Sequence, residues 1–198
     1  MADTRTIDVY DIKARDYAKL VASSVPDMHL QAFIDLVSDG GKVLDLGCGP
    51  AAASAHMRAA GLLPDPVDAS MKMVELANDT HKINARQATF EDISGTKVYD
   101  GVWANFSLLH APRAKLPLHL TALSTALKPL GVFHIGMKTG QGEKRDRIGR
   151  KYTYVSVDEL HDLLSEADLM VNYTDEGVGV GLDGSEAPWV VCRAIKHG

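Results

Sequence analysis

The sequence has few cysteines and no long apolar run, and each of these absences excludes a class of protein. Only Cys48 and Cys192 are cysteines among its 198 residues, too few for a disulfide framework or a cysteine-rich zinc site. A reducing, cytoplasmic location is therefore expected. No apolar run approaches the ~20 residues that cross a bilayer, and the first residues lack the apolar core of a signal peptide. We expect neither a membrane partner nor export.

The sequence also lacks an excess of basic residues. Its net charge of −5 argues against a non-specific nucleic-acid binder, which needs a basic face. The histidines show no ligand spacing with one another, so no metal site is predicted. What is present is an ordinary balance of 45% hydrophobic and 24% charged residues, over a length that suits one domain. No feature of the sequence indicates an oligomeric state.

Short apolar segments alternate with helical ones from residue 41 onward. We predict strands at 42–46, 65–68, 83–88, 98–105, 130–137, 169–174 and 188–195, and helices at 51–60, 70–79, 112–127 and 156–167. This alternation is typical of parallel strands joined by helical crossovers, with helices on both faces of the sheet. The predicted fold is α/β: a Rossmann-like core over 41–198, preceded by an N-terminal helical cap over 1–40, in one domain over 1–198.

Two prolines interrupt the segment that should form the second strand. Pro64 and Pro66 have no N–H to donate to a neighbouring strand. We therefore expect this strand to be short or to start late, with Asp68 still at its end. In the cap, residues 8–38 have the apolar spacing of two helices, with Ile12 and Tyr17 on the apolar face of the first.

A glycine turn follows the first predicted strand, in the segment Val43-Leu44-Asp45-Leu46-Gly47-Cys48-Gly49-Pro50. Gly47 and Gly49 can adopt positive φ and let a ligand lie against bare backbone, and the amides that start the next helix can receive acceptor atoms. Cys48 is expected to contribute only its backbone. About 20 residues further on, Asp68 can accept two hydrogen bonds from a ribose diol. The pattern predicts an adenosine-type cofactor.

Two cofactors fit this turn. Gly47 to Ala52 matches the dinucleotide fingerprint with alanine at its last position, which favours a nicotinamide-dependent oxidoreductase. Asp45, however, would repel a pyrophosphate and would suit a ligand with an ammonium group. S-adenosylmethionine carries a sulfonium, an ammonium and no phosphate, so this charge favours it. The chain also has no Tyr-x-x-x-Lys pair for an oxidoreductase. A cofactor-binding protein without catalysis is a third interpretation.

Over most of its length the sequence resembles the class I S-adenosylmethionine-dependent methyltransferases, and within them the small-molecule enzymes of the ubiquinone and menaquinone biosynthesis type. The resemblance implies a seven-stranded, mostly parallel sheet with an antiparallel last strand at or near an edge. Ala51 and Leu130 stand where this family often has glycine. The segments that match its motifs are 43–50, 67–73, 88–92, 99–110 and 127–133.

The resemblance assigns cofactor contacts to residues along these motifs. The glycine turn would hold the methionine part, Asp68 the ribose, and Met73 the adenine side together with residues of the third motif. The full set of implied cofactor contacts is Asp45, Gly47, Cys48, Gly49, Asp68, Ala69, Ser70, Met73, Phe90, Glu91, Asn105 and Tyr17.

The sequence gives few signs of catalytic residues for methyl transfer. An in-line displacement relies on positioning, and it needs a base only if the acceptor must lose a proton. His110 follows the fourth strand, near where the methyl group should point, and is the candidate catalytic and acceptor-binding residue. Lining the pocket or capping the next helix is its alternative role. Tyr10, in the cap, is a second candidate for acceptor binding, with packing on a helix face as its alternative.

Residues 138–151 carry six basic and two acidic side chains in an otherwise acidic chain. They follow the fifth strand, where both a flap over the site and a solvated loop fit the pattern. We hypothesise that Arg150, together with Tyr152, binds an anionic or polar group of the acceptor. The predicted function is transfer of a methyl group from S-adenosylmethionine to an unidentified small molecule, without a nucleic-acid partner.

Overall fold

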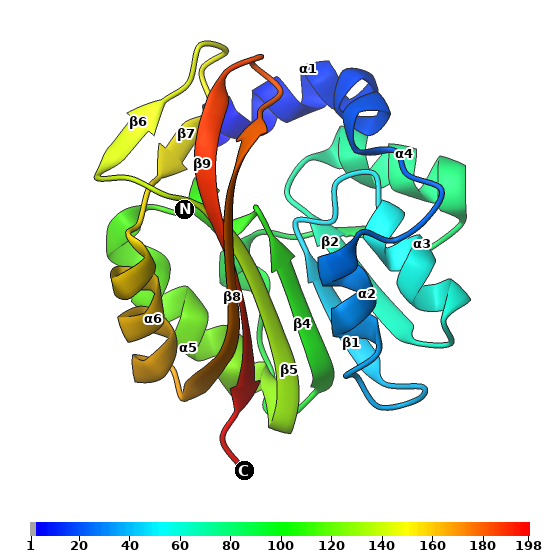
Figure 1. The fold of residues 1–198 in the computed structure, drawn as a ribbon. Helices are drawn as coiled ribbons and strands as arrows, with labels where there is room; N and C mark the ends of the chain where they lie inside the picture. The colour runs from blue at the N-terminus through cyan, green and yellow to red at the C-terminus, as the bar shows by residue number, and fades with distance from the viewer. Residues whose placement is uncertain (1–2) are drawn as a thin grey trace.

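A seven-stranded sheet forms the centre of the molecule in the computed structural model, which describes residues 3–198. The strand order is β3-β2-β1-β4-β5-β9-β8 (Figure 1). β1 to β5 run parallel, whereas β9 is antiparallel to its neighbours β5 and β8. The strands of the sheet are β1 (Lys42–Leu46), β2 (Leu63–Asp68), β3 (Arg86–Gln87), β4 (Tyr99–Asn105), β5 (Leu127–Lys138), β8 (Leu169–Val180) and β9 (Glu186–Lys196). This confirms the predicted fold, with the last strand one position from an edge.

Helices cover both faces of the sheet because its central strands carry apolar side chains on both sides. Val102 of β4 belongs to a core with α5 and α6, and the next residue, Trp103, belongs to a core with α2 and α3. The helices are α1 (Thr4–Val21), α2 (Met28–Ile34), α3 (Ala52–Ala59), α4 (Met71–His81), α5 (Leu116–Ala126) and α6 (Val157–Glu166), with short 3-10 turns η1 (Phe90–Asp92), η2 (Leu108–His110) and η3 (Arg113–Lys115). Among the described helices, none combines the length and apolar character that a membrane span requires.

The second strand is longer than its prolines suggest. β2 starts at Leu63 and pairs with β1 from Leu63 to Val67, so the expectation of a short or late strand is wrong. The Leu63 amide donates to the carbonyl of Gly41, just before β1, and by alternation Pro64 and Pro66 turn their nitrogens to the other side. On that side β3 pairs only with Val67 and Asp68, so neither proline faces a strand that needs its N–H.

The cap begins with α1, which lies across one end of the sheet beside α4 (Figure 1). Asp3 caps this helix by accepting a hydrogen bond from the Thr6 amide. Tyr17 faces the protein, but Ile12 is 82% exposed, so its predicted place on the buried face is wrong. Tyr17 comes five positions later and projects from another side of the helix.

The basic segment after β5 is neither a helix nor an irregular loop. β6 (Glu143–Arg145) and β7 (Lys151–Thr153) form a two-stranded antiparallel hairpin, and β7 lies next to the start of α1 (Figure 1). These two strands are absent from the sequence prediction, because three residues are too few for a period to be visible. The hairpin brings the basic segment to the same end of the sheet as the glycine turn.

Candidate active site

A cavity of about 750 Å³ lies at the carboxyl ends of β1, β2 and β4, beneath α1. Its walls come from α1 (Asp3, Thr6, Ile7, Tyr10, Tyr17), the glycine turn (Leu46, Gly47, Gly49), the end of β2 with the start of α4 (Asp68, Ala69, Ser70, Met73), the segment before and in η1 (Ala88, Thr89, Phe90), and the end of β4 with η2 (Asn105, Phe106, Ser107, His110). Most of the predicted cofactor residues are therefore brought together here.

Neither glycine of the turn can carry a side chain without a close contact to a neighbouring residue. Gly47 and Gly49 have φ of +72° and +53°. A Cβ on Gly47 would lie 2.5 Å from Cβ of Ser107, and one on Gly49 would lie 3.2 Å from the Tyr17 ring. The turn thus needs glycine for its backbone and for its close neighbours. It leaves bare backbone at the wall of the cavity, with the Tyr17 ring packed against Gly49.

Asp68 ends β2 with its carboxylate in this cavity. Its two oxygens accept hydrogen bonds from the amides of Gly49 and Ser70, each at 2.8 Å. A carboxylate has about four acceptor positions, so positions remain for a diol. Burial raises the pKa of Asp68 to about 6, against the lowering effect of those amides.

Asp45 lies on the other side of the glycine turn and is 2% exposed. One of its oxygens accepts a hydrogen bond from the Ser54 hydroxyl at 2.6 Å. Burial raises the pKa of Asp45 to about 7. Asp45 and Cys48 line a neighbouring cavity that shares Tyr17, Gly47 and Asn105 with the first one. A cation in that neighbouring cavity would offset the negative charge of Asp45, whose carboxylate is buried.

The adenine-side residues divide into two groups. Met73 and Phe90 present apolar surface to the cavity, and Ala69 lines it beside them. Ser70 is the N-cap of α4, and its hydroxyl donates to Asp11 of α1 at 2.5 Å. Glu91 is exposed in η1 and does not line the first cavity as described. The Ser107 hydroxyl, which the sequence analysis missed, is buried at the wall and has no hydrogen-bond partner among residues 3–198.

His110 is part of a buried polar network that joins α1 to the β6–β7 hairpin. Its Nδ1 lies 2.7 Å from the carbonyl oxygen of Lys151, and its Nε2 lies 2.8 Å from the Tyr10 hydroxyl. A carbonyl only accepts, so Nδ1 carries the proton and Nε2 accepts from Tyr10. Burial lowers the pKa of His110 to about 4, which makes the imidazole neutral at pH 7.

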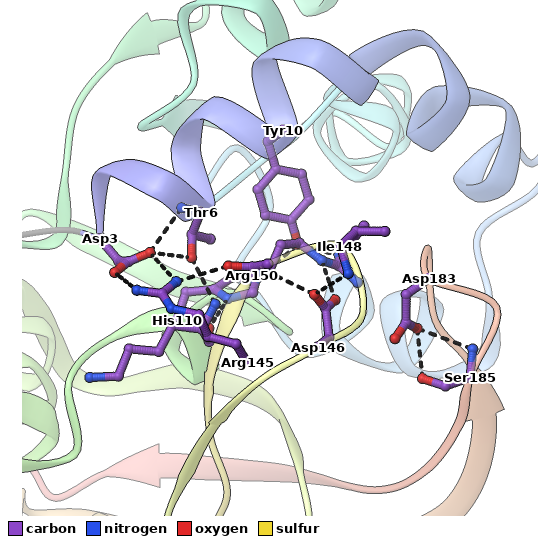
Figure 2. A network of polar contacts seen from close by, with 12 residues as sticks. Asp3, Thr6, Tyr10, His110, Arg145, Asp146, Ile148, Arg150, Asp183 and Ser185 are labelled. Atoms are coloured by element: carbon purple, nitrogen blue, oxygen red, sulfur yellow. Dashed lines mark hydrogen bonds and ion pairs between the residues drawn. The ribbon is translucent and has the colours of Figure 1, made fainter.

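Arg150 completes this network from the loop of the hairpin, as Figure 2 shows. Its Nη1 donates to the Tyr10 hydroxyl at 2.9 Å, and its Nε donates to Asp146 at 2.8 Å. The arginine and aspartate side chains of this ion pair are 3% and 5% exposed. Arg150 Nη2 is buried with no hydrogen-bond partner in the described part of the chain. The Arg150 guanidinium lies 5.2 Å from the ring centroid of Tyr152.

A larger open cleft of about 1660 Å³ adjoins the first cavity. Five residues line both spaces, which therefore meet at Tyr10, Tyr17, Asn105, Phe106 and His110. Arg150 and Tyr152 line the cleft beside Tyr10 and His110, so all four predicted acceptor-binding residues lie in it. Trp189 of β9 and Lys138 of β5 also line it. The sequence analysis did not assign either, because nothing local marks the residues at which distant strands meet.

Comparisons with known proteins agree with this geometry. The family model for a methyltransferase domain matches residues 43–131. No curated protein matches the chain at the significance level applied. The fold is similar to three solved structures, each under 20% identical to this chain. These identities are low enough that the structural similarity shows the fold alone.

The first is an S-adenosylmethionine-dependent methyltransferase from Methanosarcina mazei, with 15% identity, TM-score 0.73, and coverage of 89% of this chain and 99% of that one. The second is the 1,6-didemethyltoxoflavin-N1-methyltransferase of Burkholderia thailandensis, solved with its substrate and S-adenosylhomocysteine, with 17% identity, TM-score 0.73, and coverage of 98% and 88%. The third is an S-adenosylmethionine-dependent methyltransferase from Mesorhizobium loti, with 17% identity, TM-score 0.66, and coverage of 85% and 96%.

The methyltransferase domain matched over residues 43–131 and the Rossmann-like fold together support a methyltransferase enzyme. S-adenosylmethionine is the cofactor of this family. The residues present fit that cofactor. Bare backbone at the glycine turn, a carboxylate for a diol, apolar walls beside it and an unpartnered Ser107 hydroxyl line one cavity, and a buried carboxylate lines the next.

Proposed function

We propose that this protein transfers a methyl group from S-adenosylmethionine to a small-molecule acceptor that binds in the open cleft. The observation that carries the proposal is the meeting of the two spaces at Tyr10, Tyr17, Asn105, Phe106 and His110. A cofactor in the first cavity and an acceptor in the cleft would face each other there. Close positioning of two bound reactants can supply much of the rate of such a reaction.

The proposal assigns each cofactor part to residues that suit its chemistry. Asp68 would accept hydrogen bonds from the ribose hydroxyls, and Met73 and Phe90 would pack on the adenine. Asp45 would compensate the ammonium group from the neighbouring cavity. When bound, the cofactor supplies an electrophilic methyl group whose bond to sulfur breaks as the bond to the acceptor forms. The electron pair of the broken carbon–sulfur bond would stay on sulfur, so the transfer would need no oxidant.

His110 receives a proton in this proposal through Tyr10 and not directly. Its Nε2 already accepts from the Tyr10 hydroxyl, so a proton lost by the acceptor would pass to the Tyr10 oxygen as Tyr10 gives its own to His110. The Lys151 carbonyl then holds the other side of the imidazolium. A weak base is enough for this step, because the methylated acceptor releases its proton more easily than the free one.

The acceptor is expected to be small, and to carry an anionic or polar group that lies near Arg150 and Tyr152 in the cleft. Supporting this proposal, the toxoflavin-type neighbour acts on a small molecule. Three further expectations from the sequence remain predictions. They are that the enzyme is of the ubiquinone and menaquinone biosynthesis type, that it is located in the cytoplasm, and that it has no nucleic-acid partner. An oxidoreductase and a non-catalytic binding protein are not favoured by any feature of the site.

The experiment that tests the proposal follows a labelled methyl group. Purified protein and S-adenosylmethionine labelled in its methyl group are added to a cell extract, which is then separated by ultrafiltration. Chromatography of the fraction that passes the membrane should show label in a compound other than S-adenosylmethionine, above the background of the Asp68→Ala variant. Label that stays with protein or nucleic acid would contradict a small-molecule acceptor. If S-adenosylhomocysteine binds but no label moves, the non-catalytic interpretation replaces ours.

A further inference from the structure

Lys138 is a charged residue in the cleft that the activity described above does not yet use. It is the last residue of β5 and half-buried, and its ammonium lies 4.2 Å from the ring centroid of Tyr152. No hydrogen bond or ion pair holds this ammonium among the described residues. By contrast, Lys72, Lys128 and Lys151 each lie within 3.0 Å of a carboxylate. Burial and the nearby Arg150 lower the pKa of Lys138.

The surroundings of Lys138 leave its charge uncompensated. Arg150 lies on the same Tyr152 ring, and its own charge is matched by Asp146. Asp183, in the turn between β8 and β9, is a further acidic neighbour, and one of its oxygens accepts from the amide and hydroxyl of Ser185 (Figure 2). Two cations thus share one aromatic ring, and only one of them has a bound carboxylate. Asp146 and Asp183 match the two positive charges in number, but among residues 3–198 neither carboxylate lies within ion-pair distance of the Lys138 ammonium.

The rest of the cleft is mostly apolar, with Asp27, His29 and Asp175 also in its lining, and part of its rim is exposed. Leu20, Met28 and Val180 line it and are 54%, 67% and 59% exposed. Trp189 and Phe106 add aromatic surface, with ring centroids 6.4 Å apart. An apolar rim with a few converging polar groups marks a ligand site more often than a bare surface. A ligand that fills this cleft would meet apolar walls along its body and one cation at its end.

A row of rings connects this cation to the place where the two spaces meet. Tyr152 and His110 have centroids 4.8 Å apart, His110 and Tyr10 5.4 Å, and Tyr10 and Tyr17 5.6 Å. Tyr17 covers Gly49 of the glycine turn. A molecule held at Lys138 by one end would extend along this row, and its other end would reach the side of the cleft that faces the cofactor cavity.

We propose that Lys138 binds the anionic group of the methyl acceptor, and that the acceptor is an organic anion with an aromatic or other flat apolar body. The inference rests on the proposed function and deepens it, because it names the class of acceptor and its orientation. Arg150 is a positioning residue in this arrangement: its guanidinium is held by Asp146 and Tyr10 behind the Tyr152 ring. Lys138 makes the contact.

The test uses benzoate and 2-naphthoate as anionic probes and 2-naphthamide as a neutral one, titrated into protein saturated with S-adenosylhomocysteine and followed by calorimetry. The naphthoate should bind the natural protein more tightly than the amide. Lys138→Met should weaken naphthoate about tenfold, the usual scale of a charged contact, and leave the amide unchanged. Lys138→Arg should retain most of the affinity. Lys144→Met, a change at an exposed lysine on β6, is the matched control and should have no effect.

Three results would overturn the inference: no binding of either anion, equal binding of naphthoate and naphthamide, or unchanged naphthoate affinity in Lys138→Met. S-adenosylhomocysteine affinity is measured for every variant and should not change, which shows that each has folded. A protein that fails to bind S-adenosylhomocysteine at all contradicts the proposed function instead, so the two failures are distinguishable.

Discussion

Two buried carboxylates on either side of one glycine turn give the site its chemical character at the scale of single residues. Burial raises the pKa of Asp45 to about 7 and that of Asp68 to about 6. Both values lie above those of the unfolded chain, near 3.8. The folded protein therefore binds more protons than the unfolded one between these values, and each group costs stability as the pH rises through its folded pKa. A cationic ligand would relieve this cost.

The first prediction concerns Asp45. Because the variant Asp45→Asn cannot ionise there, its free energy of unfolding should exceed that of the natural protein by about 1–2 kcal/mol at pH 8, with the difference shrinking toward pH 5. Urea unfolding across this range measures it. S-adenosylhomocysteine affinity of the natural protein should rise about three- to tenfold from pH 6 to pH 8, and rise less in the variant. A difference in stability that is independent of pH would contradict the raised pKa.

The second prediction concerns the two departures from the glycine pattern of the family. Ala51 and Leu130 both adopt positive φ, +61° and +62°, where a side chain costs about 1 kcal/mol or more. Leu130 is 70% exposed, so its side chain adds little packing. Leu130→Gly should therefore stabilise the protein by about 1 kcal/mol in urea unfolding. The control Leu63→Gly, at an exposed strand residue with ordinary φ, should destabilise it. Destabilisation by both changes would contradict the strain.

At the scale of elements, α1 is held to the β6–β7 hairpin by polar contacts across the site. Asp3 pairs with Arg145, the Thr6 hydroxyl accepts from the Lys151 amide, and Tyr10 joins His110 to Arg150 (Figure 2). These contacts come from segments a hundred or more residues apart in the chain. They hold α1 over the cavity, so a loss of these contacts should loosen this wall of the cofactor site.

The third prediction tests this attachment with Tyr10→Phe. The change removes two buried hydrogen bonds and leaves an Arg150 nitrogen without its acceptor, a loss of about 1–3 kcal/mol. Amide hydrogen exchange in α1 should accelerate, and S-adenosylhomocysteine should bind about three- to tenfold more weakly, because part of its binding energy is spent in ordering the helix. Ile12→Ala, on the exposed side of the same helix, should change neither quantity. Unchanged exchange in Tyr10→Phe would show that other contacts hold the helix.

Element boundaries show how far the sequence predicts local structure. The strand at 42–46 is predicted to the residue, because apolar residues run without a break into a glycine turn. The prolines of β2 led to a wrong prediction of its start. A proline costs no hydrogen bond where its nitrogen faces no neighbouring strand, and the sequence does not show which strands pair. The β6–β7 hairpin is missed because its three-residue strands carry no period.

At the scale of the whole molecule, the fold follows from the sequence more fully than the site does. Alternating strands and helices leave few topologies open, since parallel crossovers share one hand. The glycine turn and Asp68 could be assigned because both lie at strand ends, which meet at one edge of the sheet. Lys138 and Trp189 could not, since their meeting depends on the register of β9 against β5, which local sequence does not specify.

The measurement that tests the account most directly is a thermal-shift titration with S-adenosylhomocysteine and, separately, with NADH and NADPH. A ligand at ~100 times its dissociation constant adds about 2.7 kcal/mol of stability, which for a domain of this size raises the midpoint by roughly 5–10 °C. Our account predicts this rise with S-adenosylhomocysteine alone, and its loss in Asp68→Ala. A rise with a nicotinamide alone would contradict the cofactor and the reaction proposed here.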